Sequence, residues 1–219
     1  MKGAPIPTSQ PYPVQAGMEA EDAKEELRRA IRKQRNGRTP KQRAQAESAF
    51  ADVVSSIPEV RDAAVVGMYA ARAAEPATGR LMDLLAGRGA RVLLPVLGSG
   101  LARDWADYTG PDDLLERAPG RPPEPGGPTL GQEALKLADV VVAPALAVDT
   151  RGVRLGQGGG WYDRVLAHAR PGTKVVAIVF PEEVYDAAER PLPFEQHDLP
   201  VHAVATTTAW HWLGDGAER

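Results

Sequence analysis

Short apolar runs without alternating polar residues recur along the chain, and they constrain its fold more than any other feature. They occupy residues 63–69, 91–97, 138–146, 174–180 and 201–207. Such unbroken runs are typical of strands buried on both faces, as in parallel sheets. Segments with helical periodicity separate most of these runs, at residues 19–34, 40–56, 76–88 and 161–168. The alternation predicts an α/β fold, a three-layer sandwich with a mostly parallel sheet covered by helices on both faces.

The length of 219 residues suits a single domain, and the 43% apolar content is enough for a sizeable core. Residues 1–17 hold four prolines and two glycines, without the apolar centre of a secretory signal. We therefore expect a disordered tail at 1–17, one α/β domain at 18–210 and a C-terminal tail at 211–219. The sequence has no cysteine, which excludes disulfides, Cys-ligated zinc and thiol catalysis.

Charge and hydropathy narrow the expected partners. The net charge of -3 argues against a general nucleic-acid binder. No run of 18 apolar residues is present, so the sequence predicts no membrane-spanning helix, and we expect a monomeric cytoplasmic protein. Residues 27–46 nevertheless carry eight Lys or Arg and no acid. This stretch is either a solvated helical face or a local anion site, and Lys24 and Arg28 lie on one face of its helix because they are four residues apart.

The sequence RLGQGGGWYDR at residues 154–164 is the strongest functional signal. It places glycines at 156, 158, 159 and 160, shortly after the apolar run 138–146. Ligands of parallel α/β sheets sit beyond the carboxyl ends of strands, where such a loop is expected. Glycines let backbone N–H groups approach an anion closely, and phosphate is the natural candidate. A tight turn is the alternative, but a turn needs only one or two glycines.

Neither common nucleotide-binding template explains this loop. A dinucleotide fingerprint starting at Gly156 would need glycine where Trp161 stands, which disfavours an NAD(P)-dependent oxidoreductase, and the Lys-Ser/Thr ending of a Walker A loop is absent. The loop carries its own chemical groups instead. Arg154 and Arg164 can neutralise phosphate charge, and Asp163 is an oxygen ligand suited to Mg²⁺. Trp161 and Tyr162 can stack on a flat ring, although one of two adjacent aromatics on a helix is expected in the core.

The segment VVVAPALAVDTRGVRLGQGGGWYDRVL (140–166) resembles the signature of the 5-formyltetrahydrofolate cyclo-ligase family, also called methenyltetrahydrofolate synthetases. The resemblance extends to KEELRRAIR (24–32), YAARAAEPATGRLMDLL (69–85) and PPEP (122–125) in the same order, and covers about residues 20–207. It implies a fold like that of the sugar-phosphate isomerase and CoA-transferase group. It also implies the ATP-dependent conversion of 5-formyltetrahydrofolate to 5,10-methenyltetrahydrofolate, with release of ADP and phosphate.

The resemblance also implies residue roles. Arg154 and Asp163 would be catalytic, and Asp163 would bind Mg²⁺. The residues implied to bind ATP are Lys24, Arg28, Arg154, Gly156, Gln157, Gly158, Gly159, Gly160, Trp161, Tyr162 and Arg164. Those implied to bind the folate, which can be polyglutamylated, are Glu75 and Trp161. Met68, just inside the end of the preceding strand, is a further candidate for this pocket. Trp105 and Tyr108 are weaker candidates for the same pocket.

Two positions depart from the family pattern. Many members have Lys where Gly159 stands, and most have Asp where His202 stands, at a place that resembles a second metal-side acid. Histidine is a poorer Mg²⁺ ligand, so Asp198 is a possible substitute. A zinc pair of His197 and His202 has no visible third ligand, and both are more simply surface or strand-edge residues. The His202 departure leaves one alternative open, a non-catalytic folate- or nucleotide-binding paralogue.

Overall fold

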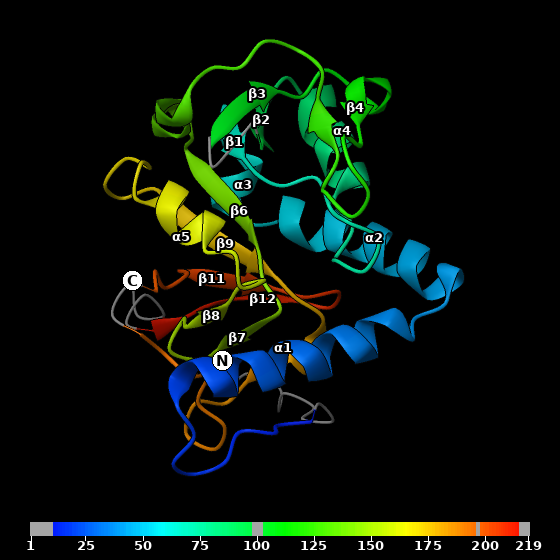
Figure 1. Cartoon of the computed structure of the whole chain (residues 1–219). Coiled ribbons are helices and arrows are strands. Elements are labelled where there is room, and N and C mark those ends of the chain that lie inside the picture. The colour runs from blue at the N-terminus through cyan, green and yellow to red at the C-terminus, as the bar shows by residue number, and fades with distance from the viewer. Residues whose placement is uncertain (1–10, 98–102, 196–197, 215–219) are drawn as a thin grey trace.

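A seven-stranded sheet forms the centre of the computed structural model, which describes residues 11–97, 103–195 and 198–214 (Figure 1). Its strand order is β12-β11-β9-β6-β1-β2-β3. The five inner strands are parallel: β1 (Val65–Gly67), β2 (Arg91–Val96), β6 (Val140–Pro144), β9 (Lys174–Ile178) and β11 (Ala203–Ala205). The two edge strands are antiparallel to them: β3 (Asp104–Asp107) and β12 (Trp210–Trp212). The expected mostly parallel sheet is confirmed.

Five α-helices accompany the sheet among the described residues. They are α1 (Ala20–Asn36), α2 (Pro40–Ser55), α3 (Pro58–Arg61), α4 (Gly79–Gly87) and α5 (Trp161–Leu166). Short 3-10 turns lie at η1 (Pro111–Asp113), η2 (Gln132–Leu137) and η3 (Pro181–Glu183). Helix α2 begins where its sequence predicts, because Thr39 forms a capping box with Gln42 and Pro40 takes the first helical position.

Helices cover both faces of the sheet. The chain leaves β1 through α4 to reach β2, and leaves β6 through α5 to reach β9, which lies in the opposite direction along the sheet. Because such crossovers are right-handed, α4 and α5 lie on opposite faces. The burial of β6 agrees, since the consecutive residues Val140 to Ala143 are all 0% exposed. Residues that alternate between the two faces can all be buried only when both faces are covered.

A second, smaller sheet supports α1. It has the order β10-β7-β8, with β7 at Ala147–Asp149, β8 at Arg154–Leu155 and β10 at Val184–Tyr185. The apolar stripe of α1 packs there rather than on the main sheet, because Leu27 and Ile31 share a buried cluster with residues of β7, β8 and β10. Figure 1 shows α1 lying across β7 and β8. The remaining strands, β4 (Leu114–Leu115) and β5 (Glu124–Pro125), form a two-stranded ribbon.

Parts of both expected tails are packed. Tyr12 lies against Tyr185 with ring centroids 5.7 Å apart, and Val14 packs on the cluster beneath α1. At the other end, β12 runs to Trp212 and Leu213 is buried. The rest of the expected tails, residues 1–10 and 215–219, lies outside the described residues. Within the described part, no helix has the length and apolarity that crossing a membrane requires.

Candidate functional site

The main cavity lies where the strand order reverses direction. From the neighbouring strands β1 and β6 the chain departs to opposite sides, toward β2 and β9. The loops after their carboxyl ends therefore diverge, and open α/β sheets bind ligands in the crevice that this divergence leaves. The loop after β1 carries Glu75, and the segment after β6 carries Arg154 and the glycine loop, residues 156–160. All of these line one cavity of about 500 Å³.

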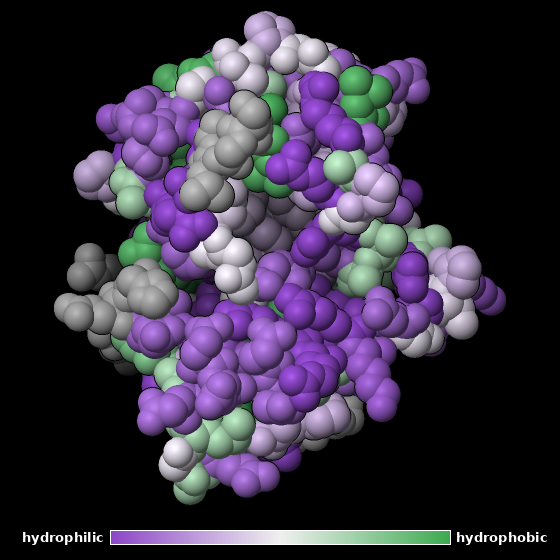
Figure 2. Space-filling model, in the orientation of Figure 1, coloured by the Kyte–Doolittle hydropathy of each residue, from purple (hydrophilic) through white to green (hydrophobic). Residues whose placement is uncertain are grey.

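The cavity is rich in positive charge. Seven cationic side chains line it, from Lys24, Arg28, Arg72, Arg103, Arg121, Arg154 and Arg164. Four carboxylates also line it, from Glu21, Glu75, Asp163 and Asp198. In the view of Figure 2, the surface is hollowed in the middle, above the strongly hydrophilic face that α1 forms. The excess of cations favours a ligand with several negative charges, such as a polyphosphate.

The residues expected to bind ATP, folate or Mg²⁺ line this cavity, except Met68 and the weaker candidates Trp105 and Tyr108. Met68 is 0% exposed and lies in the main core, so its side chain is inside the sheet packing rather than at the cavity wall. Trp105 is likewise 0% exposed, and Tyr108 donates to Asp83 at 2.5 Å; neither lines the cavity. The chain direction after β1 explains the placement, because the wall is formed by the next residues, Tyr69 and Ala70.

Two of the loop glycines are required by backbone geometry. Gly158 has a φ of +101° and Gly160 a φ of +58°, a region that side chains disfavour. A Cβ on Gly160 would also lie 2.8 Å from Nη1 of Arg164. Gly159 differs, because a Cβ there would meet no atom within 4 Å. The space beside Gly159 is consistent with the lysine that many family members carry at this position.

Helix α1 brings its cations to the loop. Arg28 donates through Nε to the carbonyl of Gly156 at 3.2 Å, and its Nη1 pairs with Glu21. Lys24 contacts carboxylate oxygens of Glu195 at 2.5 Å and Asp198 at 2.7 Å. Burial acts most strongly on the pKa of Lys24 and lowers it, but the two carboxylates together outweigh burial and raise the pKa. Both cations are therefore held at the cavity by oxygen partners.

Arg154 and Asp163 form an ion pair at the base of the loop. Arg154 is only 6% exposed, and its Nη1 also donates to the carbonyl of Pro144 at the end of β6. The Arg154 Nε has no hydrogen-bond partner among the described residues, and the same holds for Nε of Arg103 and Nε1 of Trp161. Buried donors without acceptors are rare, so these three cavity-lining groups indicate where a ligand supplies acceptors.

Gln157 joins the two halves of the site. Its Nε2 donates to Oε1 of Glu75 at 2.8 Å, while its carbonyl accepts from Arg32 at 2.7 Å. Glu75 also accepts from the backbone amide and the guanidinium of Arg72. Glu75 lies in the loop before α4, which begins at Gly79. The glycine loop and the carboxylate expected to contact folate are thus in direct contact.

The two loop aromatics have different environments. Tyr162 is the core residue of the pair, with its hydroxyl 3.4 Å from the carbonyl of Met68, and burial raises its pKa well above the ordinary value. Trp161 is only partly buried and lies 5.4 Å from the Trp105 ring and 5.0 Å from the Tyr162 ring, measured between centroids. Trp161 therefore keeps part of its surface available to a ligand while three rings support one another.

His202 lies at the amino ends of the strands, whereas the cavity lies at their carboxyl ends. Its Nδ1 accepts a hydrogen bond from the backbone N–H of Val175 at 3.0 Å, near the amino end of β9. Burial, followed by the nearby Lys174, lowers the pKa of His202. The expectation that this position is a metal-side one does not fit this geometry, since the cavity lies at the carboxyl ends of the strands. Asp198 does line the cavity, and His197 lies outside the described residues.

The carboxylates present fit a magnesium ion that arrives with phosphates. Among the described residues no group of three or more His, Asp or Glu is arranged to hold a metal by itself. Mg²⁺ in phosphoryl-transfer sites needs only one or two carboxylates, with phosphate oxygens and water completing its octahedron. Asp163 and Asp198 both line the cavity and supply that number.

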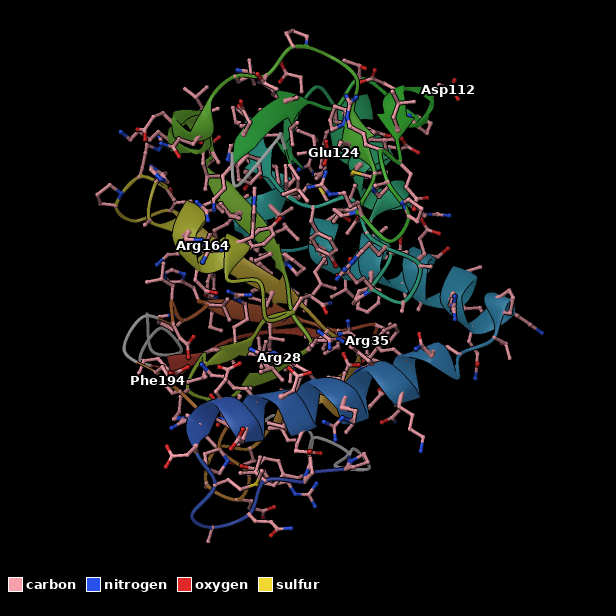
Figure 3. The ribbon with its side chains drawn as sticks, in the orientation of Figure 1. Arg28, Arg35, Asp112, Glu124, Arg164 and Phe194 are labelled. Atoms are coloured by element: carbon pink, nitrogen blue, oxygen red, sulfur yellow. The ribbon has the colours of Figure 1, made fainter. Side chains whose placement is uncertain are left out.

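Sequence patterns missed several residues of the site. Arg32 does not line the cavity but donates to the carbonyl of Gln157. It continues the row of Lys24 and Arg28 at the next helical turn, a spacing that would have identified it. Arg103 and Arg121 come from the segment between β2 and β6, where no local pattern indicates a role. Glu124 is 0% exposed and accepts from the Leu97 amide at 3.0 Å, which fixes the proline-rich loop that contributes Arg121 (Figure 3).

Comparison with known protein sequences identifies a family. The model of the 5-formyltetrahydrofolate cyclo-ligase family matches residues 20–207. A curated 5-formyltetrahydrofolate cyclo-ligase of Mycolicibacterium smegmatis is 41% identical over 143 residues, which is 63% of this chain and 71% of the relative. One from Escherichia coli is 30% identical over 186 residues, 83% of this chain and 100% of the relative.

The same relationship appears among solved structures. The structure of Aquifex aeolicus 5,10-methenyltetrahydrofolate synthetase superposes with a TM-score of 0.73 at 25% identity, covering 90% of this chain and 95% of the other. A 5,10-methenyltetrahydrofolate synthetase from Mycoplasma pneumoniae shares the fold with a TM-score of 0.63 at 15% identity, covering 83% of this chain and 96% of the other. The family match spans α1, the glycine loop and every strand of the main sheet except β12. The chain therefore belongs to the 5-formyltetrahydrofolate cyclo-ligase family.

Proposed function

We propose that this chain catalyses the ATP-dependent ring closure of 5-formyltetrahydrofolate to 5,10-methenyltetrahydrofolate, with release of ADP and phosphate. The observation that carries the proposal is the contact of Gln157 with Glu75 inside one cation-rich cavity. It brings a phosphate-type glycine loop and a carboxylate suited to a pterin edge within reach of one another. A reaction that passes a phosphoryl group from nucleotide to folate needs that proximity.

The chemistry requires activation of a poor leaving group. The formyl oxygen on N5 of the folate attacks the γ-phosphorus of ATP, the bond from that phosphorus to the bridging oxygen of ADP breaks, and ADP departs. N10 then attacks the activated formyl carbon, the N10 proton is lost, and the bond from the carbon to the phosphorylated oxygen breaks to release phosphate. Positioning and charge neutralisation are the tasks left to the protein, as in other phosphoryl transfers.

On the nucleotide side, the backbone N–H groups of residues 156–160 and the guanidinium groups of Arg28, Arg154 and Arg164 would hold the phosphates. Lys24 would join them by exchanging its contacts with Glu195 and Asp198 for contacts with phosphate oxygens. Figure 3 shows Arg28 on the side of α1 that faces the sheet and Arg164 on α5. Cations from two helices thus approach the same loop, which suits a charged group extended between them.

On the folate side, Glu75 would accept hydrogen bonds from the N–H edge of the pterin. Its side chain is only 8% exposed and is already oriented by Arg72 and Gln157, so little freedom remains to be lost on binding. Trp161 would stack on the ring system with its partly exposed face. Tryptophan keeps the stacking surface of the tyrosine usual in the family, but it lacks the hydroxyl.

Asp163 and Asp198 would hold Mg²⁺ together with the phosphates. The ion would supply neutralisation of the negative charge on the transferring phosphoryl group. Before nucleotide binds, the positive charges of Arg154 and Lys24 balance these carboxylates. These pairs hold the carboxylate oxygens beside the cavity, where a divalent cation needs them.

Further expectations rest on the family and the composition. We expect a monomeric cytoplasmic enzyme that accepts polyglutamylated substrate, with a sandwich related to the sugar-phosphate isomerase and CoA-transferase group. The alternative of a non-catalytic paralogue depended on His202, which lies at the amino ends of the strands, away from the cavity at their carboxyl ends. No feature of the described cavity favours that alternative.

The test is a direct assay. Purified protein is mixed with 5-formyltetrahydrofolate and Mg-ATP, and the absorbance of methenyltetrahydrofolate is followed. We expect one methenyltetrahydrofolate to form for each ADP released, and no product when ATP or Mg²⁺ is omitted. Absence of ATP-dependent product from folded protein would contradict the proposal, and binding of both ligands without turnover would instead favour the paralogue.

A further inference from the structure

A second, smaller cavity lies behind Glu75 and is lined by arginines. Its volume is about 150 Å³, and it is bounded by the end of α1, the start of α2, the loop at residues 71–77 and Phe180. Four guanidinium groups line it, from Arg35, Arg38, Arg43 and Arg72. Glu75 supplies the single carboxylate of the lining. Arg35, Arg38 and Arg43 belong to the basic stretch at residues 27–46, of which the expected ATP contacts use only Arg28.

Three of the four arginines have a buried nitrogen without a partner. These atoms are Nη1 of Arg35, Nη1 of Arg38 and Nε of Arg43, none of which has a hydrogen-bond acceptor within the described structure. Arg35 is itself only 2% exposed. A buried donor that lacks an acceptor costs more free energy than a typical hydrogen bond returns. Three of them lining one small cavity indicate a missing acceptor.

The charge balance of the cavity indicates an anion rather than a neutral acceptor. Arg35 pairs with Glu183, Arg38 with Glu182 and Arg72 with Glu75. Arg43 makes no ion pair with any described residue, and its Nη1 donates to the Ala73 carbonyl at 3.2 Å. One positive charge is thus left over beside three unused donors. An oxyanion has several lone pairs and can satisfy all three at once.

We propose that this cavity binds a small oxyanion, a single phosphate or carboxylate group held by Arg35, Arg38 and Arg43. The cavity volume is several times the roughly 30 Å³ share of one water, so an oxyanion fits with room to spare. Arg35 and Arg38 are fixed in place by their own carboxylate partners, and Arg38 also lies 3.4 Å from the centre of the Phe180 ring. Donors fixed in advance lose little entropy when the anion binds.

The anion would affect the main cavity as well, because Arg72 and Glu75 line both cavities. Arg72 donates to Oε1 of Glu75 at 2.8 Å. A bound anion would compete with Glu75 for Arg72 and leave that carboxylate oxygen freer to accept from another donor. The chemistry is shared by two sources: inorganic phosphate free in solution, and a carboxylate at the end of the folate substrate.

The first experiment uses inorganic phosphate as the probe and requires no catalysis. Phosphate is titrated into the full-length protein by calorimetry, for the wild type, Arg43→Gln and Lys41→Gln. Lys41 is the matched control, because it is exposed, lies on the same helix and does not line the cavity. We expect one class of phosphate sites to weaken about tenfold to a hundredfold in Arg43→Gln and to stay unchanged in Lys41→Gln.

Phosphate also has cations to bind in the main cavity, so location is tested separately. Arg28→Gln should weaken only the other class of phosphate sites. Crystals soaked in selenate, a tetrahedral oxyanion with an anomalous signal, should show a peak between Arg35, Arg38 and Arg43. Equal phosphate binding by Arg43→Gln and Lys41→Gln, together with no selenate peak, would overturn the proposal and leave only water in this cavity.

The second experiment distinguishes the two sources and rests on the proposed function. The Kd of 5-formyltetrahydrofolate is compared with that of 5-formyltetrahydropteroate, which lacks the glutamate. If the substrate supplies the carboxylate, Arg43→Gln weakens only the binding of the folate, and phosphate competes with it. If free phosphate is the ligand, Arg43→Gln changes neither Kd measured without phosphate. Inactivity of the wild type would refute the proposed function while leaving the phosphate titration valid.

Discussion

The two ends of α1 both hold buried cations against carboxylates, yet their surroundings differ. At the end toward the glycine loop, Lys24 contacts Asp198 and Glu195, whose side chains are 13% and 36% exposed. At the other end, Arg35 makes two parallel contacts with Glu183, at 2.8 and 2.7 Å, and both side chains are 1% exposed. Lys24 and Asp198 line the main cavity, where a ligand anion can replace the carboxylates, whereas Glu183 lines neither described cavity and stays enclosed with Arg35.

This difference in burial indicates separate roles for the contacts of Lys24 and for the Arg35–Glu183 pair. Arg35 also donates to the carbonyls of Ala145 and Leu146, directly after β6, so it ties α1 to the strand that precedes the glycine loop. The Arg35–Glu183 pair is therefore an anchor that fixes the position of α1 relative to the cavity (Figure 3). The pairs of Lys24 and Arg28 are exchangeable contacts that keep cations in place until a ligand arrives. The predictions below separate these two roles.

The largest effect is expected from breaking the anchor. Arg35→Met leaves the Glu183 carboxylate buried without its partner, and burial already acts to raise the pKa of Glu183. Breaking a buried pair in this way costs about 3–5 kcal/mol of unfolding free energy. Urea denaturation measures the loss, and the double variant Arg35→Met with Glu183→Leu should recover most of it. A single variant as stable as the wild type would show that the pair is no anchor.

Asp163→Asn removes a charge from the exchangeable group of contacts. Because the amide cannot neutralise a metal ion or orient Arg154 as a carboxylate does, we expect kcat to fall about a hundredfold or more, on the scale of removing one preorganised charge from a site. The unfolding midpoint should fall less than in Arg35→Met, because the Asp163 side chain is 19% exposed and the oxygen of asparagine can still accept from Arg154. Asp112→Asn is the control, an exposed acid remote from the cavity. An unchanged kcat would refute the proposed metal role of Asp163.

Arg28→Gln tests a cation at the cavity end of the helix. The loss of one charge-assisted contact to phosphate should raise the KM for ATP about tenfold to a hundredfold, with the KM for the folate nearly unchanged. Arg29→Gln is the matched control, since Arg29 is the next residue on α1 and its own side chain is 68% exposed. Equal effects of the two substitutions would mean that Arg28 acts only through the overall field of the helix.

Much of this arrangement could be predicted from the sequence. The strands of the main sheet, α1 and α2 follow from apolar runs, helical periodicity and the Thr39–Pro40 start signal, because those signals are local. The position of the glycine loop after β6 was likewise predictable from the order of the strands. The assignment of Tyr162 or Trp161 to the core was left open, and only the packing of α5 decides that it is Tyr162.

The rest depends on contacts between distant segments. The small sheet of β7, β8 and β10 has strands of two or three residues, too short to leave a pattern. The pairs Arg35–Glu183 and Lys24–Asp198 join residues more than 140 positions apart. Met68 was assigned to the pocket from its position at a strand end, whereas the direction of that side chain places it in the core. The family resemblance indicated that aspartate is usual at the position of His202, but it could not indicate at which end of the strands this residue lies.

A smaller effect is expected from restoring the family's lysine. Gly159→Lys places an ammonium beside the loop at a glycine with ordinary φ and open space around its Cβ. An added exposed charge near phosphate is worth a few tenths to about 1 kcal/mol, so the KM for ATP should fall by no more than several-fold. The matched variant Gly158→Lys should instead destabilise the loop, because Gly158 has a φ of +101°. A rise in KM for Gly159→Lys would place the phosphates elsewhere.

The smallest effect concerns His202, which is expected to be structural like the anchor rather than exchangeable. Its Nδ1 must stay unprotonated to accept from Val175, and burial followed by Lys174 lowers its pKa in the folded protein. The unfolded chain therefore binds the proton more readily. The stability that His202 contributes is complete above its ordinary pKa, about 6.5, and is lost as pH falls through the lowered folded value.

Urea midpoints at pH 7.5, 6.5 and 5.5 measure this contribution. The wild type should lose more stability across that range than His202→Asn, whose side-chain oxygen can still accept from Val175. The difference should stay below the roughly 1.4 kcal/mol per pH unit that a full proton gives. His211→Asn, at an exposed histidine on β12, should follow the wild type. If His202→Asn abolished turnover while keeping the wild-type midpoints, His202 would belong with the exchangeable cavity groups after all, and the separation between anchor and cavity would fail at that residue.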